Sequence, residues 1–120
     1  MIATSEWPRA TIDSIHRLRA LEAALPGLVV VTRTIPASFD TVWSTASDLE
    51  RTLPALGGGY VTACTITARD GEELSAIARG RGGLRDTFAI TMRPGWCWME
   101  GRLLSAGMAA VGDADTTTFA

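Results

Sequence analysis

Few side chains in this sequence have both the chemistry and the spacing of a reactive site. His16 is the single histidine, and it cannot complete a zinc site with the distant Cys64 and Cys97 at any recognised ligand spacing. No G-x-S-x-G segment supplies a serine nucleophile for the histidine to activate. A packing or surface role for His16 is favoured over a role as a general base. We therefore expect no metal and no cofactor.

Arginines within expected strands are the stronger chemical candidates. A guanidinium that points into an apolar cavity is costly unless it is paired, and it would then bind a carboxylate or phenolate of a ligand. Among four such arginines, Arg79 and Arg102 are favoured because apolar residues flank both. Solvent-facing alternation along the strands explains these arginines equally well. Asp86 and Glu100 are their expected ion-pair partners, and such cross-strand pairs are mostly structural.

Large apolar side chains are available to line a cavity for a small organic molecule. Pockets for such ligands are mostly apolar with a few placed polar groups. The candidates are Trp43, Tyr60, Phe88, Met92, Trp96 and Trp98. Ordinary core packing is the favoured interpretation for each of them taken alone. Because Trp96 and Trp98 alternate with Cys97, both face the interior or both are exposed.

Length and charge restrict the class of protein. A chain of 120 residues is the size of one domain. Its basic residues are all arginine, they are spread along the chain, and 13 acidic residues outnumber them, so no basic patch for nucleic acid is expected. No apolar run approaches the roughly 20 residues of a membrane span. The N-terminus lacks the basic start and apolar core of a secretory signal, so we expect a cytoplasmic protein.

The segment 35–53 predicts a pair of short amphipathic helices. Pro36 suits a first helical turn, where its missing N–H is not needed. Pro54 is expected to stop the second helix, which carries Leu49 and Leu53. The apolar stripe of the first helix consists of Phe39, Val42, Trp43 and Ala46. One apolar face on this helix pair requires a large apolar partner surface.

Strands separated by turn residues supply that surface. A further helix over 8–24 precedes them, and Asp70-Gly71 is a strong hairpin signal. The expected strands are 28–35, 60–69, 74–81, 84–92, 96–104, 108–111 and 116–119. Consecutive hairpins imply an antiparallel sheet, and helices that precede a run of strands imply an α+β fold.

The strand VVVTRTI, Pro36, the Val42-Trp43 pair and the segment 47–50 resemble the START-like, or SRPBCC, superfamily. This superfamily contains polyketide cyclases and dehydrases, lipid-transfer proteins and relatives of the birch-pollen allergen, all with a helix-grip fold. The stretch 94–110 and the acidic turn before Asp115-Thr116-Thr117 are also similar to its cyclase-like members. The resemblance covers 28–120 and leaves 1–27 as an N-terminal arm and helix.

The resemblance implies a curved antiparallel sheet packed on short helices, with a cavity between them for a polyketide- or lipid-like ligand. The expected ligand-binding residues are Trp43, Tyr60, Arg79, Phe88, Trp96, Trp98 and Arg102. The matching motifs are patterns of fold, so they imply no catalytic residue. One alternative is a cyclase or dehydratase that polarises a carbonyl with an arginine. Another is a protein-interaction module that uses an open sheet.

Superfamily members usually continue past the last strand with a long helix that roofs the cavity. This sequence ends at Ala120, directly after the last expected strand, so we expect either that the chain is a truncated form or that the protein lacks this helix. A bare sheet face would expose more apolar area than a monomer tolerates. We therefore expect a homodimer to cover it, with the 8–24 helix as a partial substitute for the roof.

Overall fold

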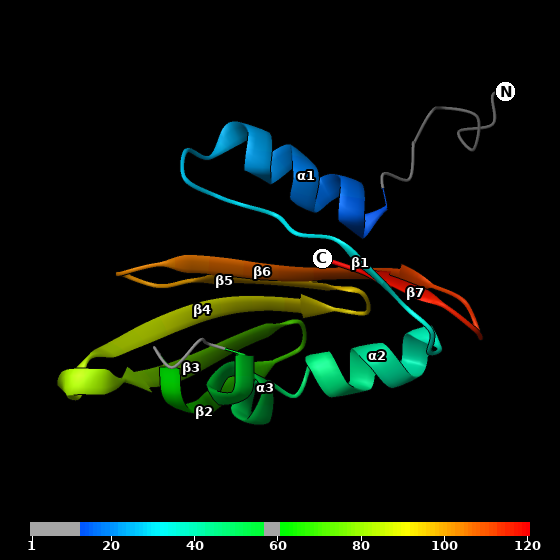
Figure 1. The fold of residues 1–120 in the computed structure, drawn as a ribbon. Coiled ribbons are helices and arrows are strands. Elements are labelled where there is room, and N and C mark those ends of the chain that lie inside the picture. Colours follow the sequence, from blue (N-terminus) through cyan, green and yellow to red (C-terminus); the bar gives the residue numbers. More distant parts are fainter. Residues whose placement is uncertain (1–12, 57–60) are drawn as a thin grey trace, which may run out of the picture.

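A computed structural model describes residues 13–56 and 61–120, which form three helices and one seven-stranded antiparallel sheet (Figure 1). The helices are α1 (Ser14–Ala24), α2 (Phe39–Ala46) and α3 (Leu49–Leu56). The strands are β1 (Arg33–Ile35), β2 (Val61–Asp70), β3 (Glu73–Gly80), β4 (Arg85–Arg93), β5 (Trp96–Glu100), β6 (Ser105–Gly112) and β7 (Thr117–Phe119). The predicted α+β class and the antiparallel sheet are confirmed.

Local turn chemistry explains most of the strand order, which is β1-β7-β6-β5-β4-β3-β2. From β2 to β7, each strand pairs with its successor in the sequence. The turn between β2 and β3 places Gly71 at a φ of 62°, a region open to glycine at little cost. The remaining pairing is long-range, since β7 places Thr117 opposite Ile35 of β1 at the edge of the sheet.

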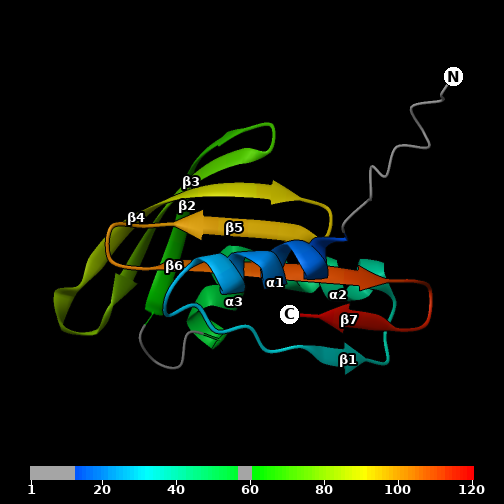
Figure 2. The same ribbon diagram turned by 90° about the horizontal axis from the view of Figure 1, so that it is seen from above.

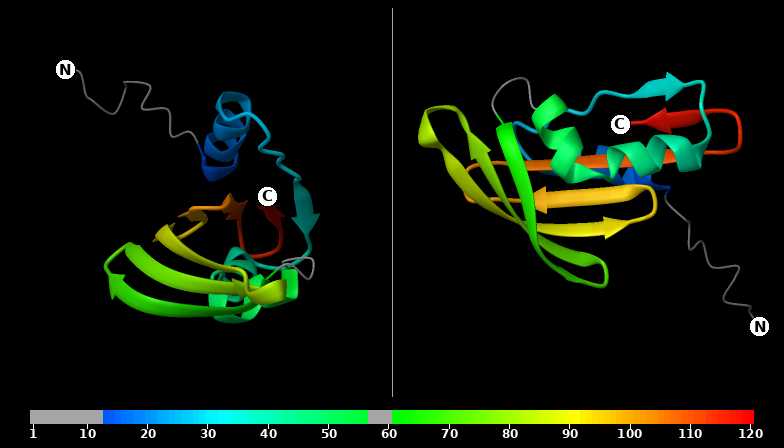
Figure 3. Two further views of the ribbon diagram at one scale, coloured as in Figure 1. Left: turned by 90° about the vertical axis from the view of Figure 1, so that its left-hand side faces the viewer. Right: turned by 90° about the horizontal axis from the view of Figure 1, so that it is seen from below.

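The two faces of the curved sheet carry different helices. We call the face that packs on α2 and α3 the core face, and the other the outer face. Figure 3 shows α2 and α3 on one side of the sheet, and Figure 2 shows α1 lying over β6 on the other. The buried core-face residues include Trp43, Leu49, Leu74, Phe88, Ile90, Cys97 and Met99. Burial of these side chains is the main stabilising contribution to the fold.

The helix α1 covers only part of the outer face. Leu18 is buried against Trp96 and Ala109, and Ser14 donates a hydrogen bond from Oγ to the carbonyl of Ala110 at 3.1 Å. This helix therefore lies on the side of the sheet opposite to α2 and α3. The expected cavity lies on the core face, between the sheet and α2 and α3. Because α1 lies on the outer face, it does not cover that cavity as the expected substitute for the roof.

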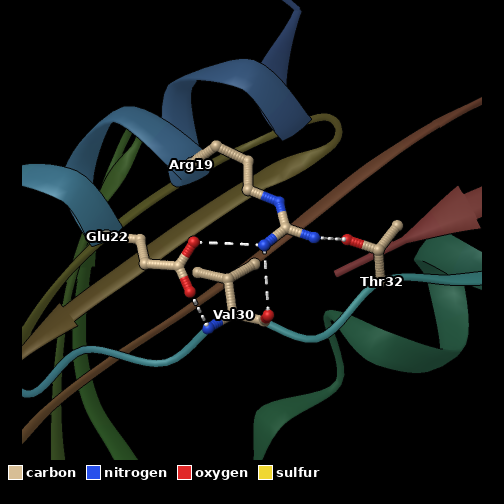
Figure 4. A network of polar contacts seen from close by, with 4 residues as sticks. All are labelled: Arg19, Glu22, Val30 and Thr32. Carbon is tan, nitrogen blue, oxygen red and sulfur yellow. Dashed lines mark hydrogen bonds and ion pairs between the residues drawn. The ribbon is translucent and has the colours of Figure 1, made fainter.

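The strand predicted over 28–35 forms only at its last three residues, Arg33–Ile35. Side chains of α1 take the hydrogen bonds that a strand partner would otherwise make (Figure 4). Glu22 accepts the N–H of Val30 at 2.8 Å, and Arg19 donates to the carbonyl of Val30 and to Oγ1 of Thr32. The β-branched composition predicts a strand throughout this segment, but only Arg33–Ile35 has a strand partner, in β7.

Both prolines of the helix pair behave differently from the prediction. The helix α2 begins at Phe39 because the side chain of Ser38 caps it, accepting the N–H of Thr41, so Pro36 lies before the helix. Pro54 lies inside α3, which continues to Leu56. The helix persists past this proline because its stripe of apolar residues, including Leu49 and Leu53, packs on the core face.

Candidate functional site

The aromatic residues expected to line one cavity lie on opposite faces of the sheet. Trp43 and Phe88 belong to the core-face cluster, whereas Trp96 and Trp98 lie on the outer face. A β-sheet separates the two pairs, so the structure does not bring them together. Tyr60 lies outside the described residues. The prediction that Trp96 and Trp98 share one face of the sheet is confirmed. Alternation alone does not specify whether that face packs on α2 and α3 or on α1.

Three of these aromatic side chains have clear packing partners. Trp43 stacks on Phe39, with ring centroids 6.5 Å apart and planes 12° from parallel. The guanidinium of Arg17 lies 5.3 Å from the ring centroid of Trp96. The indole Nε1 of Trp98 donates to Oε1 of Glu100 at 3.0 Å. Core packing accounts for Trp43, and the cover provided by α1 accounts for Trp96.

The β3–β4 turn and the β5–β6 loop lie at the same end of the sheet (Figure 1). An apolar hollow at this end is lined by residues from both sides. We call it the tip hollow, and its volume is about 200 Å³. It is lined by Val61, Ala78, Arg79, Gly80, Leu84, Arg85, Asp86, Phe88, Leu103 and Leu104. Two of the predicted ligand-binding residues, Arg79 and Phe88, therefore contribute to one site.

The loop 101–104 forms one wall of the tip hollow because β5 ends at Glu100, earlier than the predicted strand over 96–104. The carboxylate of Asp86 holds this loop, accepting the N–H of Arg102 and of Leu103, each at 2.9 Å. Close packing adds to this attachment. A Cβ at position 101 would meet the Asp86 carboxylate and lie 2.7 Å from Cε1 of Phe88, so only glycine fits there.

Backbone amides determine the charge state of Asp86. The N–H of Leu103 makes the largest contribution to a pKa below the ordinary value of 3.8, with further contributions from Arg102 and Thr87, and these outweigh the opposing effect of burial. Asp86 is therefore a carboxylate at neutral pH. Its oxygens are occupied by N–H donors, so it is a structural anion and not a base facing the hollow.

The two favoured arginines are exposed, and neither forms the predicted ion pair. Asp86 bonds to backbone N–H groups and Glu100 accepts from Trp98, so the expected cross-strand partners are occupied elsewhere. Arg79 lies directly opposite Arg85 in the β3–β4 ladder, which places two like charges side by side. In the described part of the chain, no ion pair within 4.0 Å involves Arg79, Arg85 or Arg102.

Two larger hollows lack these features. One of about 330 Å³ lies between α2 and the β1/β7 edge, where Ile35, Val42 and Phe119 share the lining with threonines and no charged side chain. Another of about 320 Å³ lies beneath the segment 27–31, beside β6. The tip hollow is smaller, but it alone among these three combines apolar walls with guanidinium groups.

The other polar candidates have structural surroundings. His16 is exposed and lies 3.1 Å from the Asp13 carboxylate at the start of α1. Cys97 is fully buried, and burial raises the pKa of its thiol to about 12. Across residues 13–56 and 61–120, no group of three or more His, Cys, Asp or Glu side chains is placed to hold a metal ion.

Comparisons with known proteins return no match to a family model, a curated protein or a solved structure. Within the described residues, none of the helices has the length and apolar character required to cross a membrane. The site must therefore be interpreted from its own geometry.

Sequence reasoning missed the leucines of the tip. Leu84, Leu103 and Leu104 are 58%, 65% and 50% exposed, although the predicted strands 84–92 and 96–104 placed all three in the sheet. Two signals were present in the sequence. Gly101 interrupts the strand pattern, and the adjacent Leu103-Leu104 pair breaks its alternation.

Proposed function

We propose that this protein binds a small hydrophobic molecule, of polyketide or lipid type, at the tip hollow. The observation that carries the proposal is an apolar hollow lined by exposed leucines and by Arg79 and Arg85, which form no ion pair with the described residues. A contiguous exposed apolar patch marks a binding site, whereas apolar residues exposed singly are common on protein surfaces. The guanidinium groups would orient an anionic or carbonyl oxygen at the mouth.

The architecture supports a START-like, helix-grip assignment as part of this proposal. The pair α2 and α3 follows β1 and packs on an antiparallel sheet of consecutive hairpins, as that resemblance implies. A likeness of fold does not by itself establish a function. It favours ligand binding over a purely structural role, but the cavity that it implies lies between sheet and helices, whereas the tip hollow lies between strands and loops.

The size of the hollow restricts the ligand. At about 200 Å³ it is below the roughly 300 Å³ at which pockets for drug-sized molecules begin. One ring or a short acyl segment therefore enters, while the rest of the ligand stays at the rim. Arg79 and Arg85 line the hollow, and Arg81 and Arg102 are next in sequence to its lining residues. These four exposed arginines favour a ligand with a carboxylate, phosphate or enolate group.

A cyclase or dehydratase activity has weaker support. Such chemistry needs a group to move a proton, and Asp86 is the carboxylate at the hollow. Its oxygens accept backbone N–H groups and its pKa is lowered, which is the opposite of what a base poised near neutral pH requires. The arginines at the hollow would orient and polarise a carbonyl, but they do not supply the base that the reaction needs. Binding with orientation is therefore the better-supported function.

The test is a titration of the ¹⁵N-labelled protein with octanoate and with 1-naphthol, followed by amide shifts in NMR spectra. We expect saturable shifts centred on Ala78, Phe88 and Leu103. Ala78→Leu fills the hollow and should abolish them. Ala68→Leu makes the same substitution at an exposed position towards the other end of β2, opposite Ser75, and should leave them intact.

Two outcomes contradict the proposal. One is a set of shifts centred on Val42 and Phe119, which would assign binding to the groove beside α2. The other is saturable binding that survives Ala78→Leu. Because that substitution adds volume to a packed site, the protection of Cys97 from thiol reagents reports whether the variant is folded.

A further inference from the structure

The tip carries exposed leucines and exposed arginines on the same two loops. Leu84 follows the β3–β4 turn, and Leu103 and Leu104 lie in the β5–β6 loop. These segments adjoin at one end of the sheet, where Asp86 joins them through its hydrogen bonds to Arg102 and Leu103 (Figure 1). The leucines are therefore presented on a well-held surface, and each is at least half exposed.

The charge of this end differs from that of the whole chain. The net charge of the protein is −2, yet this end carries four arginines in or next to the segments of the leucines: Arg79, Arg81, Arg85 and Arg102. The nearby carboxylates are Asp86 and Glu100, so the local excess is two positive charges. Both carboxylates already accept hydrogen bonds, from backbone N–H groups and from Trp98 respectively.

From this combination we propose that the tip docks onto an anionic lipid bilayer surface. Leucine side chains enter the interfacial region of the bilayer. The aliphatic part of each arginine side chain lies beside them, and its guanidinium group contacts lipid phosphates. The charge complementarity is direct, because anionic headgroups attract basic side chains held near the surface. The proposal does not rest on the proposed function, although Leu84, Leu103 and Leu104 also line the tip hollow.

The composition of the tip disfavours other partners. Single-stranded nucleic acid is bound by stacking its bases on aromatic side chains, and cores of protein interfaces are also rich in aromatic residues. In the part of the chain that the structure describes, the exposed large apolar residues at the tip are all leucines. Aliphatic side chains flanked by arginines suit lipid better than either partner.

The test is co-flotation of the purified protein with vesicles of phosphatidylcholine alone or mixed with phosphatidylglycerol. We expect binding to the anionic vesicles that weakens as salt rises, and little binding to the neutral ones. The double substitution Arg81→Gln and Arg85→Gln should weaken binding roughly 25-fold, at about five-fold per arginine. Leu103→Ser with Leu104→Ser should weaken it at least about 10-fold.

Matched controls use residues of the same kind elsewhere on the surface. Val29 and Val31 are 78% and 63% exposed, so Val29→Ser with Val31→Ser removes exposed apolar area away from the tip. Arg33→Gln with Arg51→Gln removes two exposed positive charges from β1 and α3, outside the tip. We expect neither pair to change binding by more than about two-fold, since the effect of a charge falls off within a Debye length.

Three results overturn the proposal. The first is the absence of anionic-vesicle binding at low salt by the folded wild-type protein. The second is an equal loss of binding in the valine or distant arginine controls. The third is binding to a short DNA or to neutral vesicles that matches binding to anionic ones. Because Ala78→Leu leaves the tip exterior intact, vesicle binding by that variant separates this proposal from ligand binding in the hollow.

Discussion

The carboxylate of Asp86 accepts the backbone N–H of Leu103 at 2.9 Å, and this contact joins the fourth strand to the loop after the fifth. A second bond, from the N–H of Arg102, anchors the same loop to the other carboxylate oxygen. The loop carries two of the exposed leucines, so the shape of the tip depends on one buried anion.

Asp86→Asn should loosen the loop 101–104 and lower the urea midpoint of unfolding. The amide replaces one acceptor oxygen with an N–H₂ donor, which opposes a backbone N–H. Asp115→Asn is the matched control, because that exposed carboxylate accepts no hydrogen bond from the described residues. An unchanged midpoint and unchanged amide exchange at Leu103 would show that the loop is held by packing alone.

Acid should release the loop by the same mechanism. Because hydrogen bonds from the loop lower the pKa of Asp86 in the folded protein, its contribution to stability is complete above the ordinary value of 3.8. That contribution is lost as the pH falls through the lower folded-state pKa. The amide shifts of Arg102 and Leu103 should titrate together with a midpoint below 3.8. A midpoint above that value contradicts this interpretation.

Gly101→Ala should destabilise the protein by about 2 kcal/mol, as for an overpacked core. The new Cβ would lie 2.7 Å from the Phe88 ring and would also meet the Asp86 carboxylate, so the loop must move. Chemical denaturation measures the loss. Ser105→Ala, at the exposed start of β6, is the control and should change stability by less than about 0.5 kcal/mol.

Trp43→Ala should cost about 3–5 kcal/mol of unfolding free energy, because Trp43 is buried and stacked on Phe39. Trp98→Ala should cost less, since that side chain is only half-buried on the outer face. Urea denaturation of both variants decides the comparison. If the two losses were equal, Trp43 would be lining a cavity and not filling the core.

The thiol of Cys97 should be almost inert in the native protein. With its pKa raised to about 12, its thiolate is scarce near pH 8, and we expect it to react at least about a thousand-fold more slowly than an exposed cysteine. The variant Cys64→Ala isolates this thiol, and Ellman's reagent measures its rate before and after denaturation. Rapid modification under native conditions would contradict the buried position of Cys97.

Most of the fold could be predicted because its signals are local. The hairpin between β2 and β3 follows from Asp70-Gly71, and the buried face of β4 follows from the alternation of Asp86, Phe88 and Ile90. Helix ends were less predictable. Ser38, and not Pro36, sets the start of α2, since a capping side chain satisfies free N–H groups whereas a proline only removes one.

The candidate site was predictable only in part. Arg79 and Phe88 do line one hollow, but Trp96 and Trp98 lie on the other face and the leucines of the loop 101–104 were assigned to a strand. Periodicity states which residues share a face, and it contains no information about which helix will cover that face. That choice depends on contacts between residues far apart in the chain.

By itself the sequence determined the α+β class, the antiparallel hairpins and the helix pair, because turns and periodicity act over a few residues. Only the tertiary structure decided that α1 covers the outer face, that 28–32 bonds to α1 and not to a strand, and that Asp86 holds the loop of Leu103. Each of these depends on a partner 8 or more positions away in the chain, and no local pattern specifies such a partner.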